Sequence, residues 1–241
     1  MKYIIKNSII VLVFTFGFSS LSAQYMPKNL PNYDHKQWHF GFTLGVNTMN
    51  FNIKPVDYRQ YDSTIAVIQP IPSQGFNIGI VANKRLVKYL DIRFVPTLSF
   101  GQRNIKYIIK TKDKKEDLFV KSVESTFLDF PITLKYKSKR FDGRLNNMRA
   151  YVLGGARYSL DLASQKKKKG TSDVIVIKLD PNDFMLTGGV GFEFYLAYFK
   201  FGVQLQMAYG LVNVLNKEKT IYTTNVEKLS SKMAWITFTF E

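Results

Sequence analysis

Residues 38–53, WHFGFTLGVNTMNFNI, alternate between large apolar side chains and small or polar ones. The period of two places the apolar side chains on one side of an extended strand and the others on the opposite side. Aromatic residues and threonine favour a pleated strand, and this spacing fits no helical stripe. One such strand cannot fold alone. The chain must therefore supply more strands, and the apolar side must face a core or a membrane.

Seven later stretches repeat this pattern, so we predict eight strands. They are residues 38–53, 75–82, 89–108, a stretch that ends in 127–136, 150–162, 184–195, 200–210 and 232–241. The phase of the fifth is ambiguous, because Tyr151 and Leu153 fall opposite its other apolar residues. Residues 174–177 are a further short candidate that would extend a strand beyond the main sheet. No segment after the N-terminal one has the length of a transmembrane helix.

The connections between these strands alternate in kind. Those after the first, third, fifth and seventh strands are long or strongly polar, and those after the second, fourth and sixth are mostly shorter. Long loops at one end and short turns at the other are typical of outer-membrane barrels. An even number of strands places both termini at the short-turn end, which is periplasmic in this topology. The 15% aromatic content suits a barrel with aromatic girdles at the membrane interfaces.

The N-terminus has the pattern of a secretory signal peptide. Lys2 and Lys6 precede an apolar run, residues 9–18, and small residues follow up to Ala23. The apolar run is shorter than a membrane-spanning helix requires. We therefore expect a signal peptide at 1–23, an extended periplasmic lead-in at 24–37 and an outer-membrane barrel at 38–241. The chain has no cysteine, which excludes a disulfide framework and a lipid-anchored cysteine.

The side of the strands opposite the apolar one is rich in small and uncharged polar residues, with scattered charges of both signs. In a soluble sandwich this side would face bulk water. Inside an eight-stranded barrel the interior is just wide enough for side chains to fill it. We predict a filled lumen, cross-linked by acid–base pairs, and not a diffusion pore. The charged residues of this predicted network are Asp91, Arg93, Arg103, Asp129, Lys135, Arg157, Asp161 and Glu193.

Two prolines and the C-terminus complete the description of the strands. Pro96 and Pro131 each remove a ladder hydrogen bond, and they fall on the adjacent third and fourth strands. A shared bulge or a position at a rim would accommodate both. The chain ends in alternating apolar residues up to Phe240, as expected for an outer-membrane barrel, but the last residue is Glu241 in place of an aromatic one.

Several segments resemble a known family. Asn32-Tyr33-Asp34 followed by HFGFTLGVNTMNF, then IRFVPTLSFGQR, FLDFPITLKYKS and AYGLVNVL, is similar to the PorT outer-membrane barrel family of the Bacteroidota, called SprT in gliding bacteria. The similarity covers roughly residues 24–241, and its N-terminal segment is the most specific part. The resemblance implies a component of the type IX secretion system, which exports proteins with a C-terminal sorting domain. It implies no catalytic residues.

Other classes of function fit the residues less well. An outer-membrane lipase or acyltransferase needs a base to activate its serine, and the only histidines are His35 and His39, near the periplasmic rim. The scarcity of His and Cys also argues against a transition-metal site, and nothing indicates another cofactor. The net charge of +16 is compatible with anionic partners, but no nucleic-acid-binding motif is present in this exported chain.

An adhesive or structural barrel of the OmpX or OmpA type is the main alternative, with residues 54–74 and 212–230 as ligand-binding loops. A run of four lysines, Lys166, Lys167, Lys168 and Lys169, lies in a predicted outer loop. It is either a solvated loop tip or a contact for lipopolysaccharide or another anionic surface. We expect outer-membrane lipid and other secretion components, not nucleic acid, as partners.

Overall fold

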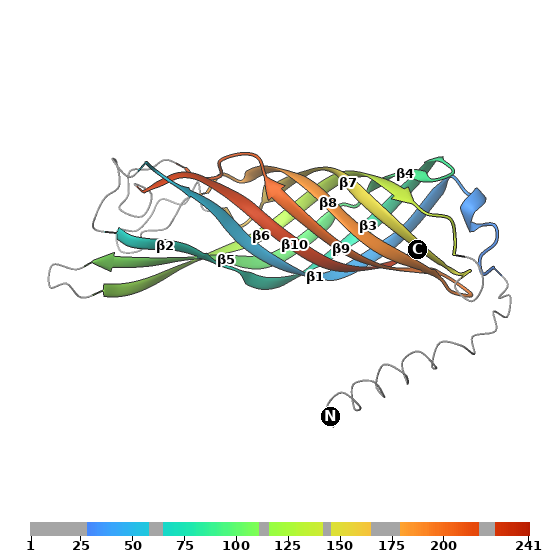
Figure 1. Ribbon diagram of the computed structural model, residues 1–241, viewed down its shortest axis with the longest axis horizontal. Coiled ribbons are helices and arrows are strands. Elements are labelled where there is room, and N and C mark those ends of the chain that lie inside the picture. The colour runs from blue at the N-terminus through green and yellow to red at the C-terminus, as the bar shows by residue number, and fades with distance from the viewer. Residues whose placement is uncertain (1–27, 58–64, 111–115, 142–145, 165–178, 217–224) are drawn as a thin grey trace, which may run out of the picture.

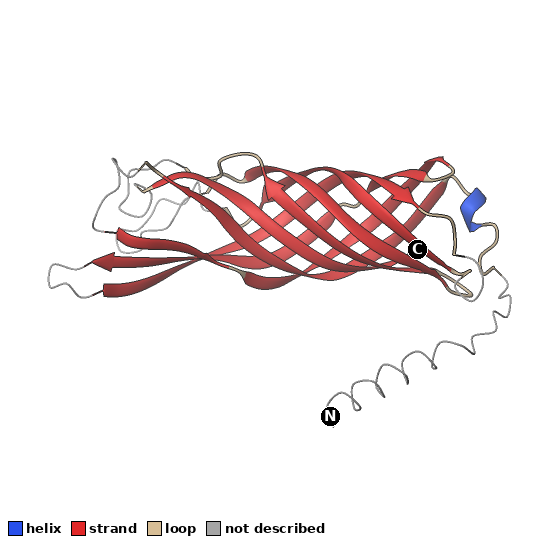
Figure 2. Cartoon of the chain, in the orientation of Figure 1, coloured by secondary structure: helices blue, strands red, loops and turns tan. Residues whose placement is uncertain are grey.

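The computed structural model describes residues 28–57, 65–110, 116–141, 146–164, 179–216 and 225–241. These residues form an antiparallel β-barrel with one short 3₁₀ helix at one end (Figure 1, Figure 2). Among them, no helix has the length and apolarity needed to cross a membrane. The elements are η1 (Tyr33–His35), β1 (Trp38–Pro55), β2 (Ile65–Ile71), β3 (Ser73–Val87), β4 (Leu90–Phe94), β5 (Thr97–Lys110), β6 (Glu116–Lys137), β7 (Met148–Asp161), β8 (Asn182–Tyr195), β9 (Lys200–Gly210) and β10 (Val226–Phe240).

The barrel closes through β1, which pairs with β10 on one side and with β3 on the other. The ring then runs through β4 and β5, which share one position, to β6, β7, β8 and β9. It therefore has eight positions, as the alternation of the sequence predicts. The short turns β3–β4, β6–β7 and β8–β9, together with η1 and the C-terminus, lie at one end, which we call the near end (Figure 1). The opposite end is the far end.

The predicted strand 89–108 is wrong in one respect, since it is interrupted at Val95 and Pro96. Phe94 at the end of β4 pairs with Ile132, and Thr97 at the start of β5 pairs with Asp129, so Pro131 lies across from the interruption. Neither proline has an N–H group to donate to the ladder. Both prolines share one break in the pairing, and the long strand divides there into β4 and β5.

The link predicted at 54–74 is also wrong in part, because it contains β2. This strand pairs with β5 and is the last strand of the sheet. β5 extends to Lys110, beyond the end of the predicted strand 89–108, and β6 starts at Glu116. β2, β5 and β6 together extend beyond the ring at the far end (Figure 1). The candidate strand at 174–177 lies outside the described residues.

The outer face of the ring is apolar along the middle of the strands. On β3 it runs from Phe76 through Ile78 and Ile80, which is 65% exposed, to Lys84 at the near end. On β10 Lys232 lies toward the far end of the corresponding apolar stripe. If this face were in water, it would be a large contiguous apolar surface of a kind that soluble monomers rarely expose. A membrane accounts for it, with polar residues where the strands leave the bilayer.

Aromatic side chains gather on both ends of this face. Phe42 stacks on Phe240 with ring centroids 4.9 Å apart at the near end, and Phe76 stacks on Phe100 at 4.8 Å toward the far end. Trp38 is half exposed and has the ammonium group of Lys84 5.2 Å from its ring centroid. Amphipathic aromatic rings beside lysine are typical of the membrane interface.

Candidate functional site

The inner face of the barrel carries the charges, arranged in tiers from the near end to the far end. In the near tier, the Lys200 ammonium lies 2.7 Å from a Glu193 carboxylate oxygen and 2.8 Å from a Glu241 oxygen. Lys135 also donates to Glu193, and Arg93 lies 3.2 Å from Glu241. All five side chains are almost completely buried. Five charged groups from β4, β6, β8, β9 and the C-terminal residue therefore form one network.

A second near-end pair involves Asp91. Its carboxylate accepts hydrogen bonds from Lys137 at 2.8 Å and from the Asn83 amide at 3.0 Å. Together with the preceding network, this pair ties β3 and β4 to β6. Removing one partner from such a buried pair leaves an uncompensated charge, which generally costs about 3–5 kcal/mol.

The middle of the lumen is polar and nearly filled. Arg157 donates to Asp129 at 3.0 Å, and its guanidinium stacks on Trp235 at 3.9 Å from the ring centroid. Asp129 also accepts hydrogen bonds from Ser99 at 2.7 Å and from Ser159. This arrangement neutralises both charges and connects β5, β6, β7 and β10.

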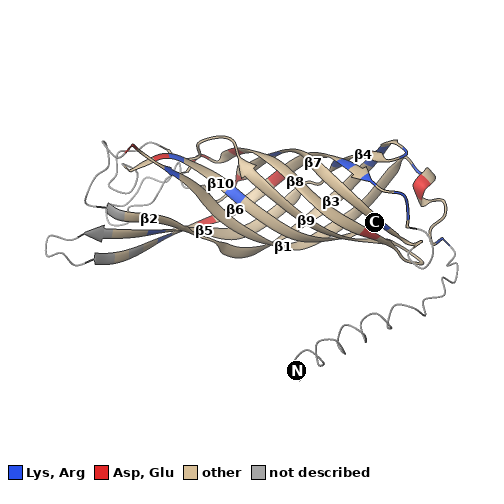
Figure 3. Ribbon diagram, in the orientation of Figure 1, with Lys and Arg blue, Asp and Glu red and all other residues tan. Residues whose placement is uncertain are grey.

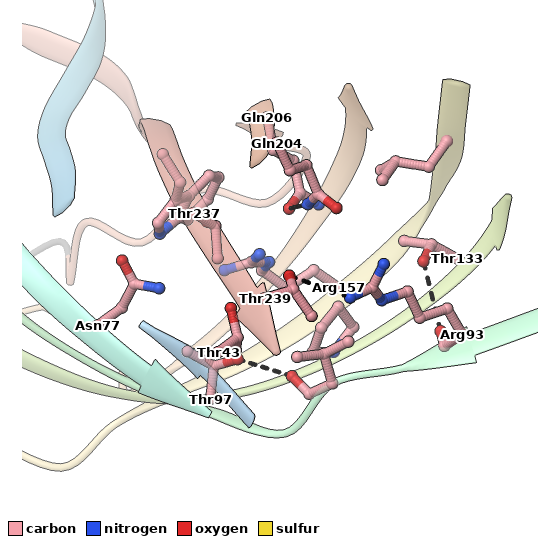
Figure 4. Close-up of a pocket in the computed structure, with 14 residues that line it drawn as sticks. Thr43, Asn77, Arg93, Thr97, Thr133, Arg157, Gln204, Gln206, Thr237 and Thr239 are labelled. Atoms are coloured by element: carbon pink, nitrogen blue, oxygen red, sulfur yellow. Dashed lines mark hydrogen bonds between the residues drawn. The ribbon is translucent and has the colours of Figure 1, made fainter. Parts of the chain in front are cut away.

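A small cavity of about 30 Å³ lies beside this middle tier (Figure 4). Its volume admits a few water molecules at most. Arg93 and Arg157 both line it, but each is paired with a carboxylate, so the cavity has no unmatched positive charge for an anion. Asn77 lines the cavity and its Oδ1 is buried without a protein partner, and ordered water is the simplest group to satisfy it. Its remaining polar lining consists of Thr43, Thr97, Thr133, Gln204, Gln206, Thr237 and Thr239.

Arg103 dominates the far tier. Its guanidinium donates to Ser125 at 2.9 Å, to Ser231 at 3.1 Å and to Asp161 at 2.8 Å. It also lies between the rings of Phe51 and Phe127, with centroids at 4.6 and 4.8 Å. The side chain is 1% exposed and contacts residues of β1, β6, β7 and β10. It therefore acts as a cross-link between five strands.

Two apolar clusters close the remainder of the lumen. One cluster lies inside the ring and contains Met49, Phe127, Met185, Ala208, Met233 and Trp235. The other lies at the far end and contains Phe51, Ile105, Tyr107, Val123, Leu179, Val214, Leu215, Val226 and Leu229. Close-packed apolar side chains leave no room for a water path. The tiers and clusters of the described residues thus fill the barrel along its length.

The segment before β1 covers the near end of the lumen. Tyr33 stacks on His39 at 4.0 Å between ring centroids and donates from its hydroxyl to Glu241 at 3.0 Å. The Tyr33 carbonyl accepts a hydrogen bond from His39 Nε2 at 2.8 Å, which places the proton of the neutral ring on that nitrogen. The lead-in, predicted to be extended, is instead turned. Leu30 has φ of 46° and η1 follows, because these contacts and those of Asp34 hold the segment against the barrel.

Asp34 anchors this segment, which we call the cap (residues 29–35), through two arginines. Its carboxylate lies 3.1 Å from Arg140 Nε and 3.2 Å from Arg149 Nη1. Arg140 also donates to the carbonyls of Asn29 and Leu30, and its guanidinium lies 3.5 Å from the Tyr195 ring centroid. Figure 3 shows the acidic residue of η1 at the same end of the barrel as basic residues on neighbouring strands.

The electrostatic environment of the cap favours the charged form of Asp34. Burial acts to raise the pKa of Asp34, but Arg149 and Arg140 outweigh it, and the pKa lies below its ordinary value. Burial raises the pKa of the Tyr33 hydroxyl, with the nearby Glu241 carboxylate adding to it. Asp34 is therefore ionised and Tyr33 is a neutral hydrogen-bond donor at neutral pH.

The eight residues of the predicted charge network all point into the lumen and are buried, but they do not pair only with one another. Arg103 with Asp161, Arg157 with Asp129 and Lys135 with Glu193 are pairs within the set. Asp91 and Arg93 pair with Lys137 and Glu241, which are not in the predicted set. Lys200, which pairs with Glu193 and Glu241, is not in it either. Asp34 of the cap and its partners Arg140 and Arg149 are also absent from the predicted set. The four lysines 166–169 lie outside the described residues.

The alternation of inward and outward side chains, extended to the ends of the strands, predicts the inward direction of three of these residues. Lys137 has the same parity as Lys135, Lys200 the same parity as Gln204, and Glu241 the same parity as Thr239. Each is consequently directed inward. Tyr151 and Leu153, whose phase was ambiguous, also point into the lumen, and Tyr151 donates to Gln204 at 3.0 Å. Among the described residues, no group of three or more His, Asp or Glu side chains could hold a metal ion.

The apolar outer face, the closed ring and the buried charged interior define an integral outer-membrane β-barrel with a filled lumen. The family model for the "outer membrane protein beta-barrel domain" matches residues 22–216. The chain belongs to this family, and the protein is an outer-membrane protein.

Several solved outer-membrane proteins are similar to this chain at low sequence identity. OprG from Pseudomonas aeruginosa is 16% identical over 85% of this chain and 95% of its own, with a TM-score of 0.43. Neisserial surface protein A is 12% identical over 85% and 98%, with a TM-score of 0.40. Ail of Yersinia pestis, solved with the heparin analogue sucrose octasulfate, is 11% identical over 85% and 99%, with a TM-score of 0.36. No curated protein matches the sequence significantly.

Proposed function

We propose that this protein is a non-catalytic component of the type IX secretion system, needed for export of proteins with a C-terminal sorting domain and for gliding motility where it occurs. In this proposal both termini and the cap lie in the periplasm, and the far end faces the cell exterior. The partners are other secretion components and outer-membrane lipid.

The filled lumen is the observation that carries the proposal. Buried ion pairs, two apolar clusters and a cavity of only about 30 Å³ occupy the interior of the barrel. A barrel of this kind does not offer a diffusion path for solutes, so its role must depend on what its ends and outer face bind. The resemblance of residues 32–51 to the PorT family gives that role its identity, and the same residues include Tyr33 and Asp34 of the cap.

A clean gene deletion tests this proposal directly. We expect cargo with a sorting domain to accumulate in the periplasm of the deletion strain, and a plasmid copy of the gene to restore export. A plasmid that encodes an unrelated small barrel is the control for a general defect of the outer membrane. Normal export in the deletion strain would rule out the secretion role.

An adhesive or structural barrel is the second candidate, favoured by the extension of β2, β5 and β6 beyond the ring. In this case the far end binds lipopolysaccharide or another surface ligand. Lys232, 5.6 Å from the Tyr209 ring centroid, is positioned for a headgroup contact on the outer face. Normal export combined with loss of surface binding after removal of the far-end loops would favour this candidate over the first.

A further inference from the structure

At the far end, two strand edges lack strand partners among the described residues. β1 pairs with β10 along its length up to Pro55, but its pairing with β3 ends at Met49, opposite Ser73. β2 pairs with β5 on one side and is the last strand of the sheet. The outer part of β1, residues 50–55, and the free edge of β2 are therefore both available for pairing.

The two edges line one groove. It has a volume of about 410 Å³ and is formed by Phe51, Asn52, Ile53 and Pro55 of β1 with Val67, Ile68 and Pro70 of β2. The volume is within the range of sites that bind ligands. β2 follows β3 along the same edge of β5, and the groove opens where β1 and β2 diverge beyond the pair of Met49 with Ser73. It thus lies between two strand edges that are paired nearer the middle of the barrel.

At alternate residues, the backbone N–H and C=O groups of β1 point into this groove. The Phe51 N–H donates to the side-chain oxygen of its neighbour Asn50, at 2.9 Å, in place of a strand partner. In an antiparallel strand, alternate residues direct their N–H and C=O groups to the same side. Ile53 therefore faces the same side as Phe51. An extended polypeptide is the ligand whose own N–H and C=O groups match such an edge.

The side chains of the groove are mostly apolar. Phe51 is buried in the far-end apolar cluster, against which Ile53 and Ile68 pack. Asn52 and Lys54 are exposed at its rim, and Lys54 pairs with Glu227 at 2.9 Å. A bound strand with alternating side chains would place apolar ones on the cluster and polar ones in water.

We propose that this groove binds an extended polypeptide segment with alternating apolar side chains, which adds to the β1 edge as a strand. Residues 50–55 would accommodate about six residues, roughly 20 Å at 3.3 Å per residue. The proposal goes beyond the secretion role and does not depend on it. An acyl chain would match the apolar lining but would leave the peptide groups of the β1 edge without partners.

A synthetic peptide binding experiment tests the proposal with the full-length protein in detergent micelles. The probe is a fluorescent seven-residue peptide of alternating threonine and valine. The matched control has the same side chains but carries N-methyl groups on alternate amides of one edge. We expect saturable binding of the probe by fluorescence anisotropy, at least tenfold weaker binding of the methylated peptide, and slower hydrogen exchange of the Phe51 and Ile53 amides with the probe bound.

Variants of Ile53 identify the edge. Ile53→Pro removes the N–H that faces the groove, whereas Ile53→Val keeps it, so only the first should weaken binding. Thermal unfolding of both variants verifies that the barrel has folded. No saturable binding at millimolar probe, equal binding of the methylated peptide, or exchange protection of the Ile53 amide without peptide would overturn the proposal. Displacement of both peptides alike by a short fatty acid would also overturn it, since the groove would then be a lipid site.

Discussion

The far tier offers the sharpest test of whether the lumen is closed to water. Arg103 donates three hydrogen bonds of 2.8 to 3.1 Å and lies between two aromatic rings. Replacement by methionine retains most of the side-chain volume but leaves Asp161 without its cation. Because both partners are about 2% exposed, we expect Arg103→Met to lower the free energy of unfolding by about 3–5 kcal/mol.

A double-mutant cycle with Asp161→Asn separates the pair from its surroundings. Asp161 also accepts hydrogen bonds from the backbone N–H groups of Thr126 at 3.3 Å and Ala163 at 3.1 Å, and asparagine can retain acceptors for them. We expect the single asparagine variant to lose about 3–5 kcal/mol and the double variant to lose little more than either single variant. The coupling energy should then be nearly as large as the loss in one single variant, about 3–5 kcal/mol.

The measurement is denaturant unfolding in phospholipid vesicles, followed by the fluorescence of Trp38 and Trp235. Conditions must be chosen in which folding and unfolding curves coincide, so that a free energy is defined. Lys106→Met on the outer face of the same strand is the matched control and should change stability by less than about 0.5 kcal/mol. In a water-filled lumen Arg103 would be solvated. A loss below about 1 kcal/mol and additive effects would then refute the argument.

Three further predictions concern the outer face, the ring and the cap. Ile80→Lys, in the middle of the apolar face, should lower the free energy of unfolding by about 2–4 kcal/mol in the same assay. Leu86→Lys, near the end of the strand, should lower it by less than about 1 kcal/mol. Equal losses in the two variants would contradict the membrane position. Gly155→Ala places a Cβ 2.1 Å from the Ile132 carbonyl oxygen and should lower the free energy of unfolding by about 1–3 kcal/mol. Gly154→Ala is the control and should be neutral, because the nearest atom to its Cβ is 3.9 Å away. Similar thermal unfolding of the two variants would argue against this packing. Burial acts to raise the pKa of Asp34, but Arg149 and Arg140 hold that pKa below its ordinary value. The cap contact is therefore present at neutral pH and is lost in acid, as the pH falls through the lowered pKa. The measurement uses a spin label attached to Lys36→Cys, since the chain has no other cysteine. The label should become more mobile only in that acidic range, and the added Asp34→Asn substitution should give the mobile spectrum at pH 7. A mobility change centred near pH 6 would point to histidine instead.

The alternation of the sequence predicts the ring because lipid and lumen impose opposite demands on adjacent residues. Phe42 and Leu44 face outward while Thr43 is buried inside, as the period of two requires. The predicted strands omit β2, because its proline indicates a link. Residues 65–71 include Pro70 and were assigned to a link, yet a strand at the edge of a sheet tolerates a missing N–H.

The partners of the lumen charges could not be deduced from the sequence, because pairing across the barrel depends on register and shear. Arg93 is bridged to Glu241, the last residue of the chain, and Lys200 bridges Glu241 to Glu193. These residues are distant in sequence and come from different strands. The cap was unpredictable for a similar reason: Asp34 is held by Arg140 and Arg149, which lie on either side of a turn more than a hundred residues away.

The two ends of the barrel differ in how the described residues cover them. At the near end, Tyr33 and Asp34 of the cap supply hydrogen-bond and ion-pair partners to Glu241, Arg140 and Arg149. At the far end, the outer part of β1 and the free edge of β2 have no described strand partner. An unpaired strand edge favours binding of another strand, since peptide groups at the edge gain hydrogen bonds when a strand is added. Among the described residues, the far end therefore offers the strand edges to which we propose that a polypeptide adds, whereas the near end is covered by the cap.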